Sequence, residues 1–465
     1  MMRSLFSGVS GLKNHQTRMD VIGNNISNVN TTGFKSSRVN FEDSLSQTLT
    51  AASSASGTTG GTNPKQIGLG SKISAIDVNF KDGSVQSTGI NTDLCLSGNA
   101  LFVVKQGNQT FYTRNGAFNF DAEGNLVNAE GLYVQGYMNA SATEHNSVNT
   151  NGATTSIAIR AGKTMPSSQT QKAEYINNLN ATAATITKMV FTKSDGTTEE
   201  KTGTATVDGT TYTAAVLTMS DNTTQTVTSG TYTKGNSIPL STTVKVYDSL
   251  GYAHVVPITV EKTGNDTWSA KLAKASWQED DGTTTTVSMT GGDIEFNTNG
   301  SYKSGSANLI VNPGNGAATG QKVTVTFDKL TQYANSSTIN AEADGYASGT
   351  LDTVTIDESG TVVGTYSNGV LRKEAQIAVA QFTNAPGLTK KGNSLYTESN
   401  NSGTPNIGTA EGFGATITAS ALEMSNVDVA EEFSNMIITQ RGFQSNSKII
   451  TVSDEMLENL INMKR

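Results

Sequence analysis

Large apolar residues recur at every seventh position near both ends of the chain, and this pattern constrains the fold more than any other feature. Such spacing places side chains on one narrow stripe of an α-helix. Before the second repeat, Asp428 followed by Glu431 has the pattern of a capping box. We name the repeated residues the apolar seam: Leu5, Val9, Leu12, Met19, Ile22 and Ile26, then Val429, Phe433, Met436, Phe443, Ile450, Leu457 and Ile461.

The seam predicts one helix from Ser4 to about Val29 and a second that starts after Asp428. The second helix has room for about 35 residues, or roughly 50 Å at the rise of an α-helix. Lys464 and Arg465 lie where the helix dipole favours positive charge.

Neither terminal helix is expected to be stable alone. Isolated helices of this length are marginal in water, and Gly8, Gly11 and Gly23 each weaken the first by roughly 0.5–1 kcal/mol. One alternative is that the two ends pack on each other as a coiled coil within a single monomer, without neighbouring copies. Two helices nevertheless present too narrow an apolar surface to cover both Phe433 and Phe443. We therefore expect the ends to stay largely disordered until neighbouring copies bury the seam, in a non-closing contact that gives a filament or tube.

The middle of the chain predicts antiparallel β structure. Apolar and polar residues alternate at 244–246, 258–260, 323–327, 354–356 and 377–379, and Asp-Gly or Asn-Gly pairs separate such runs. The fold class expected is mainly β and multidomain, with a discontinuous α-helical coiled-coil terminal domain and antiparallel β domains nested between its two helices. The expected domains are a helical core (1–30 and 427–465), an extended linker region (31–70 and 405–426), an inner β domain (71–148 and 338–404) and an outer β domain (149–337) with an inserted β subdomain at 182–236.

Composition excludes several classes of function. The net charge of −8 argues against a nucleic-acid partner, since phosphate binding needs a basic face and none stands out, and no apolar run reaches the length of a membrane span. Cys95 is the only cysteine, and its apolar surroundings indicate a small buried hydrophobe. His15, His145 and His254 lack metal-ligand spacing, and the acidic turn at 279–281 lacks the closing Glu of a calcium loop. No nucleophile and base present themselves, so we expect no catalytic, cofactor or metal residues and no enzyme activity.

A conspicuous polar segment follows the first predicted helix. It contains Asn24, Asn25, Asn28, Thr32, Gly33 and Phe34, and it resembles the Asn-Asn motif of bacterial flagellar rod and hook proteins. Asparagine suits a helix end because its amide replaces lost backbone hydrogen bonds and it tolerates the left-handed conformation. Further similarity covers roughly residues 1–137 and 340–465, including Tyr366–Gly369, Leu422–Asp428 and Gln440–Asn446. Ala100-Leu101 departs from the Gly-Phe usual in the family.

Rod proteins are much shorter than this chain, and the segment Val246–Gly251 with His254 and Trp268 resembles the outer domain of hook proteins. The resemblance implies a structural subunit of the hook, which polymerises into a flexible curved tube and transmits torque from rod to filament as a universal joint. It implies a homopolymer that meets the hook cap, the distal rod and the hook–filament junction proteins. It also implies passage through the flagellar type III export apparatus without a cleaved signal peptide, to an extracellular site in the flagellum, without membrane insertion. A distal rod protein and a secreted β-rich surface protein are the alternatives.

Overall fold

The computed structural model describes residues 2–55, 57, 59–141, 146–280 and 282–463. Asp281, His145, Lys464 and Arg465, which the sequence arguments used, lie outside these residues. The chain divides into two compact units. Unit 1 comprises Met1–Lys163, Leu351–Thr365 and Leu371–Arg465, and unit 2 comprises Thr164–Thr350 and Tyr366–Val370.

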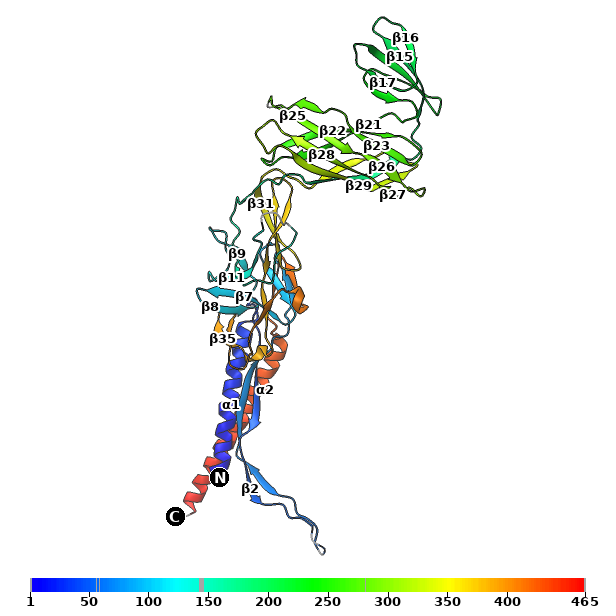
Figure 1. The fold of residues 1–465 in the computed structure, drawn as a ribbon. Coiled ribbons are helices and arrows are strands. Elements are labelled where there is room, and N and C mark those ends of the chain that lie inside the picture. The colour runs from blue at the N-terminus through cyan, green and yellow to red at the C-terminus, as the bar shows by residue number, and fades with distance from the viewer. Residues whose placement is uncertain (1, 56, 58, 142–145, 281, 464–465) are drawn as a thin grey trace. The chain divides into compact units, whose positions relative to one another are not determined.

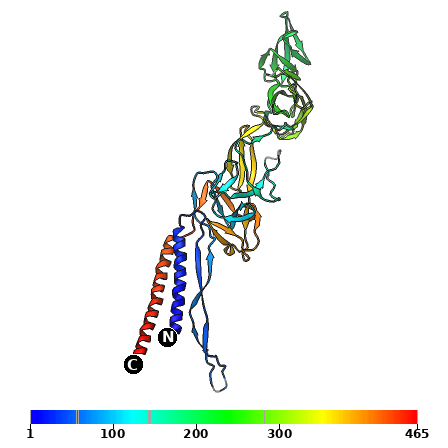
Figure 2. The ribbon, with the colours of Figure 1, turned by 90° about the vertical axis from the view of Figure 1, so that its left-hand side faces the viewer.

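Two long helices at the chain ends belong to unit 1. They are α1 (Met2–Ser27) and α2 (Val429–Asn462), and they run side by side in opposite directions (Figures 1 and 2). The predicted cap of α2 is confirmed, because Asp428 Oδ1 accepts hydrogen bonds from the backbone N–H of Ala430 at 2.9 Å and of Glu431 at 3.2 Å. The cap fixes the start of α2 where the chain leaves the β structure.

A two-stranded ribbon follows α1 and packs along it. Its strands are β1 (Ser37–Asp43) and β4 (Ser71–Val78), which pair antiparallel. Between them the chain forms the hairpin of β2 (Ser46–Thr50) and β3 (Lys65–Gly68), all of whose residues are exposed. Figure 1 shows this hairpin extending away from the helices.

The main sheet of unit 1 is built from strands of both halves of the chain. Its strand order is β31 (Gly349–Ile356), β32 (Thr361–Tyr366), β33 (Leu371–Ile377), β11 (Tyr133–Met138), β7 (Ala100–Gln106), β8 (Gln109–Thr113), β36 (Leu395–Thr397) and β35 (Thr389–Gly392). Attached to this path are β9 (Phe118–Phe120), β10 (Leu126–Asn128), β12 (Thr155–Ser156), β34 (Val379–Gln381) and β37 (Asn406–Gly408). Two separate antiparallel strand pairs join residues 85–97 to the segment that precedes α2. They are β5 (Val85–Ser87) with β39 (Ala421–Glu423) and β6 (Leu94–Ser97) with β38 (Thr416–Ala419). Unit 1 also contains two short 3-10 helices, Ala385–Gly387 and Glu411–Phe413. Leu94, Phe102, Phe118 and Ile377 are fully buried in its core.

Unit 2 contains a pair of sheets that share one core. The first sheet has the order β24 (Ser276–Gln278), β25 (Thr284–Gly291), β28 (Ser306–Asn312), β29 (Gln321–Tyr333), β14 (Lys172–Asn180) and β30 (Asn340–Ala343). The second has the order β21 (Leu240–Tyr247), β22 (Ala253–Lys262), β23 (Thr267–Leu272), β26 (Asp293–Phe296) and β27 (Tyr302–Ser304). Trp268, Val246, Val325 and Phe327 lie in the core.

A further small cluster within unit 2 is formed by residues 186–233. Its strands are β15 (Ile186–Lys193), β16 (Thr198–Lys201), β18 (Tyr212–Met219) and β19 (Thr224–Val227), beside the pair β17 (Thr204–Val207) and β20 (Gly230–Thr233). It buries its own set of apolar side chains, among them Met189, Phe191 and Leu217. The short β13 (Thr164–Met165) pairs with the start of β31.

The predicted fold class is confirmed, since β strands are the main regular structure of the described residues between the two terminal helices. The predicted strands at 244–246, 258–260, 323–327 and 354–356 lie within β21, β22, β29 and β31. The run at 377–379, predicted as one strand, is instead shared between the end of β33 and the start of β34. All three of its residues are buried, so alternation there did not mark one continuous strand.

Candidate self-assembly surface

Three glycines lie where α1 and α2 come close together. A Cβ atom placed on Gly11 would lie 2.8 Å from the side chain of Asn446, and one placed on Gly442 would lie 2.7 Å from the ring of His15. A Cβ on Gly8 would lie 3.3 Å from Ile450 Cγ1. Real Cβ atoms rarely come this close to a neighbour, so the absence of side chains at these glycines is what lets the helices approach.

Hydrogen bonds continue the same contact toward the other end of α1. Arg18 donates from Nη2 to Asn435 Oδ1 at 3.1 Å, and Asn25 donates from Nδ2 to Glu432 Oε1 at 2.8 Å. Burial raises the pKa of Glu432 above its usual range. The contact stripe on α1 therefore runs through Gly8, Gly11, His15, Arg18 and Asn25.

The apolar seam largely follows other faces of the helices. Among its members only Ile22 is buried, at 4% exposure. Leu5, Leu12, Met19, Ile26, Met436, Ile450 and Leu457 are partly exposed. Val9, Val429, Phe433, Phe443 and Ile461 are exposed, Phe433 at 49% and Phe443 at 42%.

Further large apolar side chains are exposed on the helices. They are Phe6 on α1 and Ile437, Ile438, Ile449, Val452, Met456 and Leu460 on α2. The seven-residue repeat did not select them because they lie at other positions of the helical turn. Together with the seam they leave α2 apolar on several faces, which is typical of a helix buried among neighbours.

Asn25 of the polar motif is a structural junction. It is 1% exposed, and besides Glu432 its Nδ2 contacts the backbone O of Ser37 at 2.9 Å, while its Oδ1 accepts from the Ser37 N–H at 3.0 Å. One amide thus joins α1, α2 and the start of β1. Asn28 Nδ2 donates to the backbone O of Asn24 at 2.9 Å, which occupies a carbonyl in the last turn of α1.

The next motif residues attach the end of α1 to the β structure. Gly33 has φ +67°, and a Cβ there would lie 2.6 Å from the backbone N of Asn115, so the close approach requires glycine. Thr32 Oγ1 lies 3.2 Å from Asn115 Oδ1. The Nζ of Lys390 lies 4.7 Å from the centroid of the Phe34 ring, within the range of a cation–π contact.

A buried ionic cluster beside the motif was not predicted from the sequence. Glu423 accepts from Lys35 Nζ at 2.6 Å, from Arg114 Nη1 at 3.3 Å and from the N–H of Gly83 at 2.9 Å. The side chains of Lys35, Arg114 and Glu423 are at most 1% exposed. Burial, and then the charge of Arg114, lowers the pKa of Lys35. Lys35 and Glu423 are far apart in sequence, so no local pattern could have paired them.

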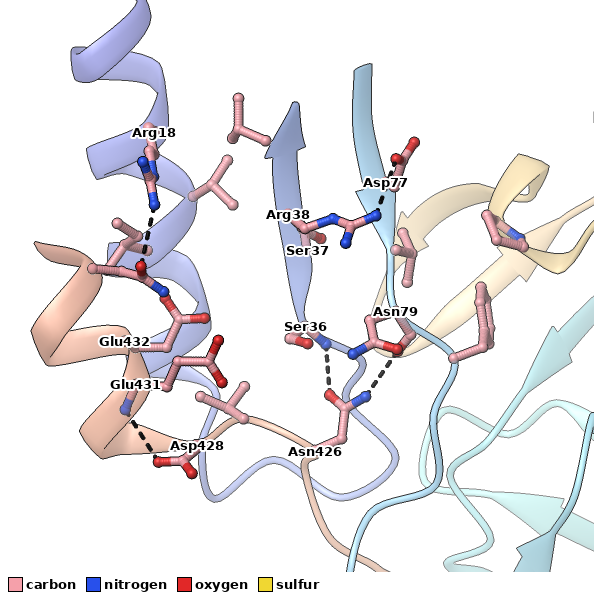
Figure 3. Close-up of a pocket in the computed structure, with 18 of the residues that line it drawn as sticks. Arg18, Ser36, Ser37, Arg38, Asp77, Asn79, Asn426, Asp428, Glu431 and Glu432 are labelled. Carbon is pink, nitrogen blue, oxygen red and sulfur yellow. Dashed lines mark hydrogen bonds and ion pairs between the residues drawn. The ribbon is translucent and has the colours of Figure 1, made fainter. Parts of the chain in front are cut away.

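A polar pocket of ≈ 800 Å³ lies between α1, the ribbon and the start of α2. Figure 3 shows Asn426 spanning part of it: Oδ1 accepts from the Ser36 N–H at 2.8 Å, and Nδ2 donates to the Asn79 backbone O at 2.8 Å. Acidic Glu431 and basic Arg38 also line the pocket. The bonds of Asn426 tie the chain entering α2 to the ribbon.

Cys95 is 2% exposed, and burial raises the pKa of its thiol to about 11, as expected of a small buried hydrophobe. Over the part of the chain that the structure describes, no group of three His, Cys, Asp or Glu residues could hold a metal ion. Neither described helix has a stretch long and apolar enough to cross a membrane.

Four segments match protein-family models. Residues 5–35 match "Flagella basal body rod protein", and residues 95–163 match "Flagellar hook protein FlgE/F/G D1 domain". Residues 219–346 match "Flagellar basal body protein FlaE D2 domain", and residues 418–463 match "Flagellar basal body rod FlgEFG protein C-terminal".

Full-length relatives decide the family. The flagellar hook protein FlgE of Treponema pallidum is 39% identical, and the match covers 100% of both chains. The chain belongs to the flagellar hook protein family. FlgE of Escherichia coli is 30% identical over 98% of each chain. The flagellar basal-body rod protein FlgG of Bacillus subtilis is 29% identical, and the match covers 100% of both chains.

Proposed function

We propose that this structural subunit of the flagellar hook polymerises by burying the exposed apolar side chains of α1 and α2 against neighbouring copies. The observation that carries the proposal is the exposure of Phe433, Ile437, Ile438 and Phe443 on a helix already paired with α1. Full burial of one such side chain contributes about 1.5–3 kcal/mol, so many copies can offset the entropy lost on assembly.

The β units between the helices supply the outer parts of the tube. Their surfaces are rich in threonine and asparagine, as on β17 and β20, where Thr204 and Thr206 pair with Thr233 and Thr231. Polar, hydrated contacts rearrange at lower cost than dry apolar ones. This difference supports a tube whose helical core carries torque while its outer layers slide as it bends.

The domain limits stated above remain our proposal for these layers: core 1–30 and 427–465, linker 31–70 and 405–426, inner 71–148 and 338–404, outer 149–337. We further propose a homopolymer that meets cap, distal rod and junction proteins after export through the type III apparatus without a cleaved signal. In this view packing, not catalysis, is the mechanism.

Two substitutions in α2 test the proposal. Phe443→Asp together with Ile450→Asp should abolish polymerisation, because each places a carboxylate where an apolar side chain must be buried. The matched control is Gln444→Asp with Thr451→Asp, which adds the same charge at neighbouring exposed positions. Electron microscopy counts the tubes, and tryptophan fluorescence from Trp268 and Trp277 confirms that unit 2 is folded. Tubes formed equally by both variants would refute the role of these side chains.

The same microscopy separates the hook from the alternative of a distal rod. A hook subunit should give curved tubes, whereas a rod subunit should give straight, stiff ones. A secreted β-rich surface protein would give neither, and it offers no reason for the apolar terminal helices.

A further inference from the structure

The apolar seam alone does not determine how α1 and α2 align. A seven-residue repeat matches itself again after a slip of seven residues, so Leu5 would simply take the place of Leu12. The contact between the helices also includes glycines and polar residues, beside the apolar Ile22 and Ile450. Another feature must therefore select one alignment.

Two reciprocal contacts have the geometry to do so. On α1, Gly11 leaves a notch that the amide of Asn446 fills, and on α2, Gly442 leaves a notch that the ring of His15 fills. Each helix thus provides one notch and one polar side chain, four residues apart. Asn446 is held in place by a bond from its Nδ2 to the backbone O of Gly442 at 3.0 Å.

We propose that the pairs Gly11–Asn446 and Gly442–His15 fix the register and antiparallel pairing of α1 and α2. The effect of this register on assembly rests on the proposed function, in which α1 and α2 form the core of the tube. The register of the two helices itself does not depend on that function.

A slip of seven residues loses both fits. In one direction Asn446 would meet the side chain of Arg18 where the native pair has the Gly11 notch, and Gly442 would face Ile22 in place of the His15 ring. In the other direction Gly442 would face Gly8, which leaves a gap, and Asn446 would face Ser4. Either slip also breaks the hydrogen bond from Arg18 to Asn435.

The fit of the His15 ring makes the selection of one alignment stricter. His15 Nδ1 is buried and has no hydrogen-bond partner among the described residues, and the His15 ring packs edge-on against Phe41 at 6.1 Å between centroids. A ring held by shape alone tolerates little displacement. The contact therefore discriminates between alignments by fit more than by gross attraction.

Alanine substitutions in the full chain test the proposal. Gly11→Ala and Gly442→Ala should each raise the critical concentration for polymerisation at least tenfold. Gly23→Ala is the matched control, because a Cβ there has no atom within 4 Å although Gly23 lies on the same helix. It should leave the critical concentration unchanged or lower it, since alanine favours helix.

A compensating variant separates lost fit from general damage. The methyl group added by Gly11→Ala would clash with the side chain of Asn446. Asn446→Ala removes that side chain. Combining the two substitutions should therefore cause less than a twofold further loss relative to Gly11→Ala alone, or a partial recovery. Independent effects would multiply instead. A multiplied loss, or a Gly23→Ala variant as impaired as the notch variants, would overturn the proposal.

A disulfide reports the register directly, whether or not tubes form. Gly8→Cys with Ile450→Cys places two thiols close together in the observed alignment, and the native Cys95 is too buried to compete. Oxidation should cross-link the parent and the Gly23→Ala variant but lose at least half of its yield in Gly11→Ala and Gly442→Ala. Equal yields in all four would overturn the register role. The unsubstituted chain tests the proposed function separately, because its failure to form tubes would refute that function whatever the cross-link yields.

Discussion

The buried cluster around Glu423 yields a quantitative prediction about the stability of unit 1. Glu423→Ala removes the carboxylate that lies 2.6 Å from Lys35 Nζ and 3.3 Å from Arg114 Nη1. Asp82 remains near Arg114, but its side chain is 40% exposed and more strongly screened. Removing one partner of a buried ion pair typically costs about 3–5 kcal/mol, because the remaining charge stays desolvated. At about 2–4 °C per kcal/mol for a unit of this size, unit 1 should melt on the order of 10 °C lower.

The positions of the two tryptophans make the measurement specific. Trp268 and Trp277 both lie in unit 2, so fluorescence follows unit 2 while far-UV circular dichroism follows both units. In Glu423→Ala the dichroism should show an early transition that the fluorescence lacks. The unchanged fluorescence midpoint then serves as an internal reference.

Glu42→Ala is the matched control, since Glu42 forms a 2.9 Å ion pair with Lys72 in which both side chains are exposed, at 43% and 59%. Exposed pairs contribute little to stability, so this variant should melt like the parent. The reasoning is refuted if Glu423→Ala shifts the dichroism no more than Glu42→Ala. It is also refuted if the fluorescence midpoint falls by the same amount.

Three further predictions concern single side chains. Burial, and secondarily the charge of Arg18, lowers the pKa of His15, so the separated helices bind a proton more tightly than the paired ones. The stability contributed by neutral His15 is complete above about pH 6.5 and is lost below it. The protection factors of α1 amides, which divide out the intrinsic pH dependence of hydrogen exchange, should therefore fall as the pH drops from about 6.5 to 5. His15→Gln should remove this fall, and protection factors that do not change over this range in the parent would contradict it. Burial raises the pKa of the Cys95 thiol to about 11, so the thiol should resist alkylation at about pH 8 in the folded chain and react fully in urea. Rapid alkylation of the folded chain would contradict the burial of Cys95. His254 lies between Asp248 at 3.1 Å and Glu279 at 2.9 Å, so His254→Ala should lower the free energy of unfolding of unit 2 by about 1–3 kcal/mol, measured by tryptophan fluorescence in urea, and an unchanged midpoint would disprove the contribution.

Local patterns were enough to predict the terminal helices and many strands. The cap at Asp428 depends on residues that are adjacent in sequence, and the alternation at 323–327 reflects burial on one face of β29. The predicted second helix agrees well with the 34 residues of α2. Each of these features follows from periodicity or from neighbours within one turn.

Long-range polar contacts were beyond such patterns. Apolar periodicity detects only large hydrophobic side chains, so it passed over Gly11, His15, Gly442 and Asn446, which lie in contact between the helices. Helix propensity counts glycines only as weak points. Gly11 and Arg18 are also seven residues apart, at helical positions different from those of the seam residues. This spacing was the signal in the sequence that could have indicated the contact stripe. The link from Asn25 to Glu432 joins the two chain ends and exists only after the chain has folded.

The central claim is that assembly buries the exposed apolar faces of the terminal helices while the β units stay as they are. Hydrogen–deuterium exchange read by mass spectrometry tests it by comparing monomer with assembled tubes. Peptides from 429–462 should exchange quickly in the monomer and at least a hundredfold more slowly in tubes, while peptides from β7 and β29 should exchange alike in both. Equal exchange of 429–462 in the two states would contradict the account.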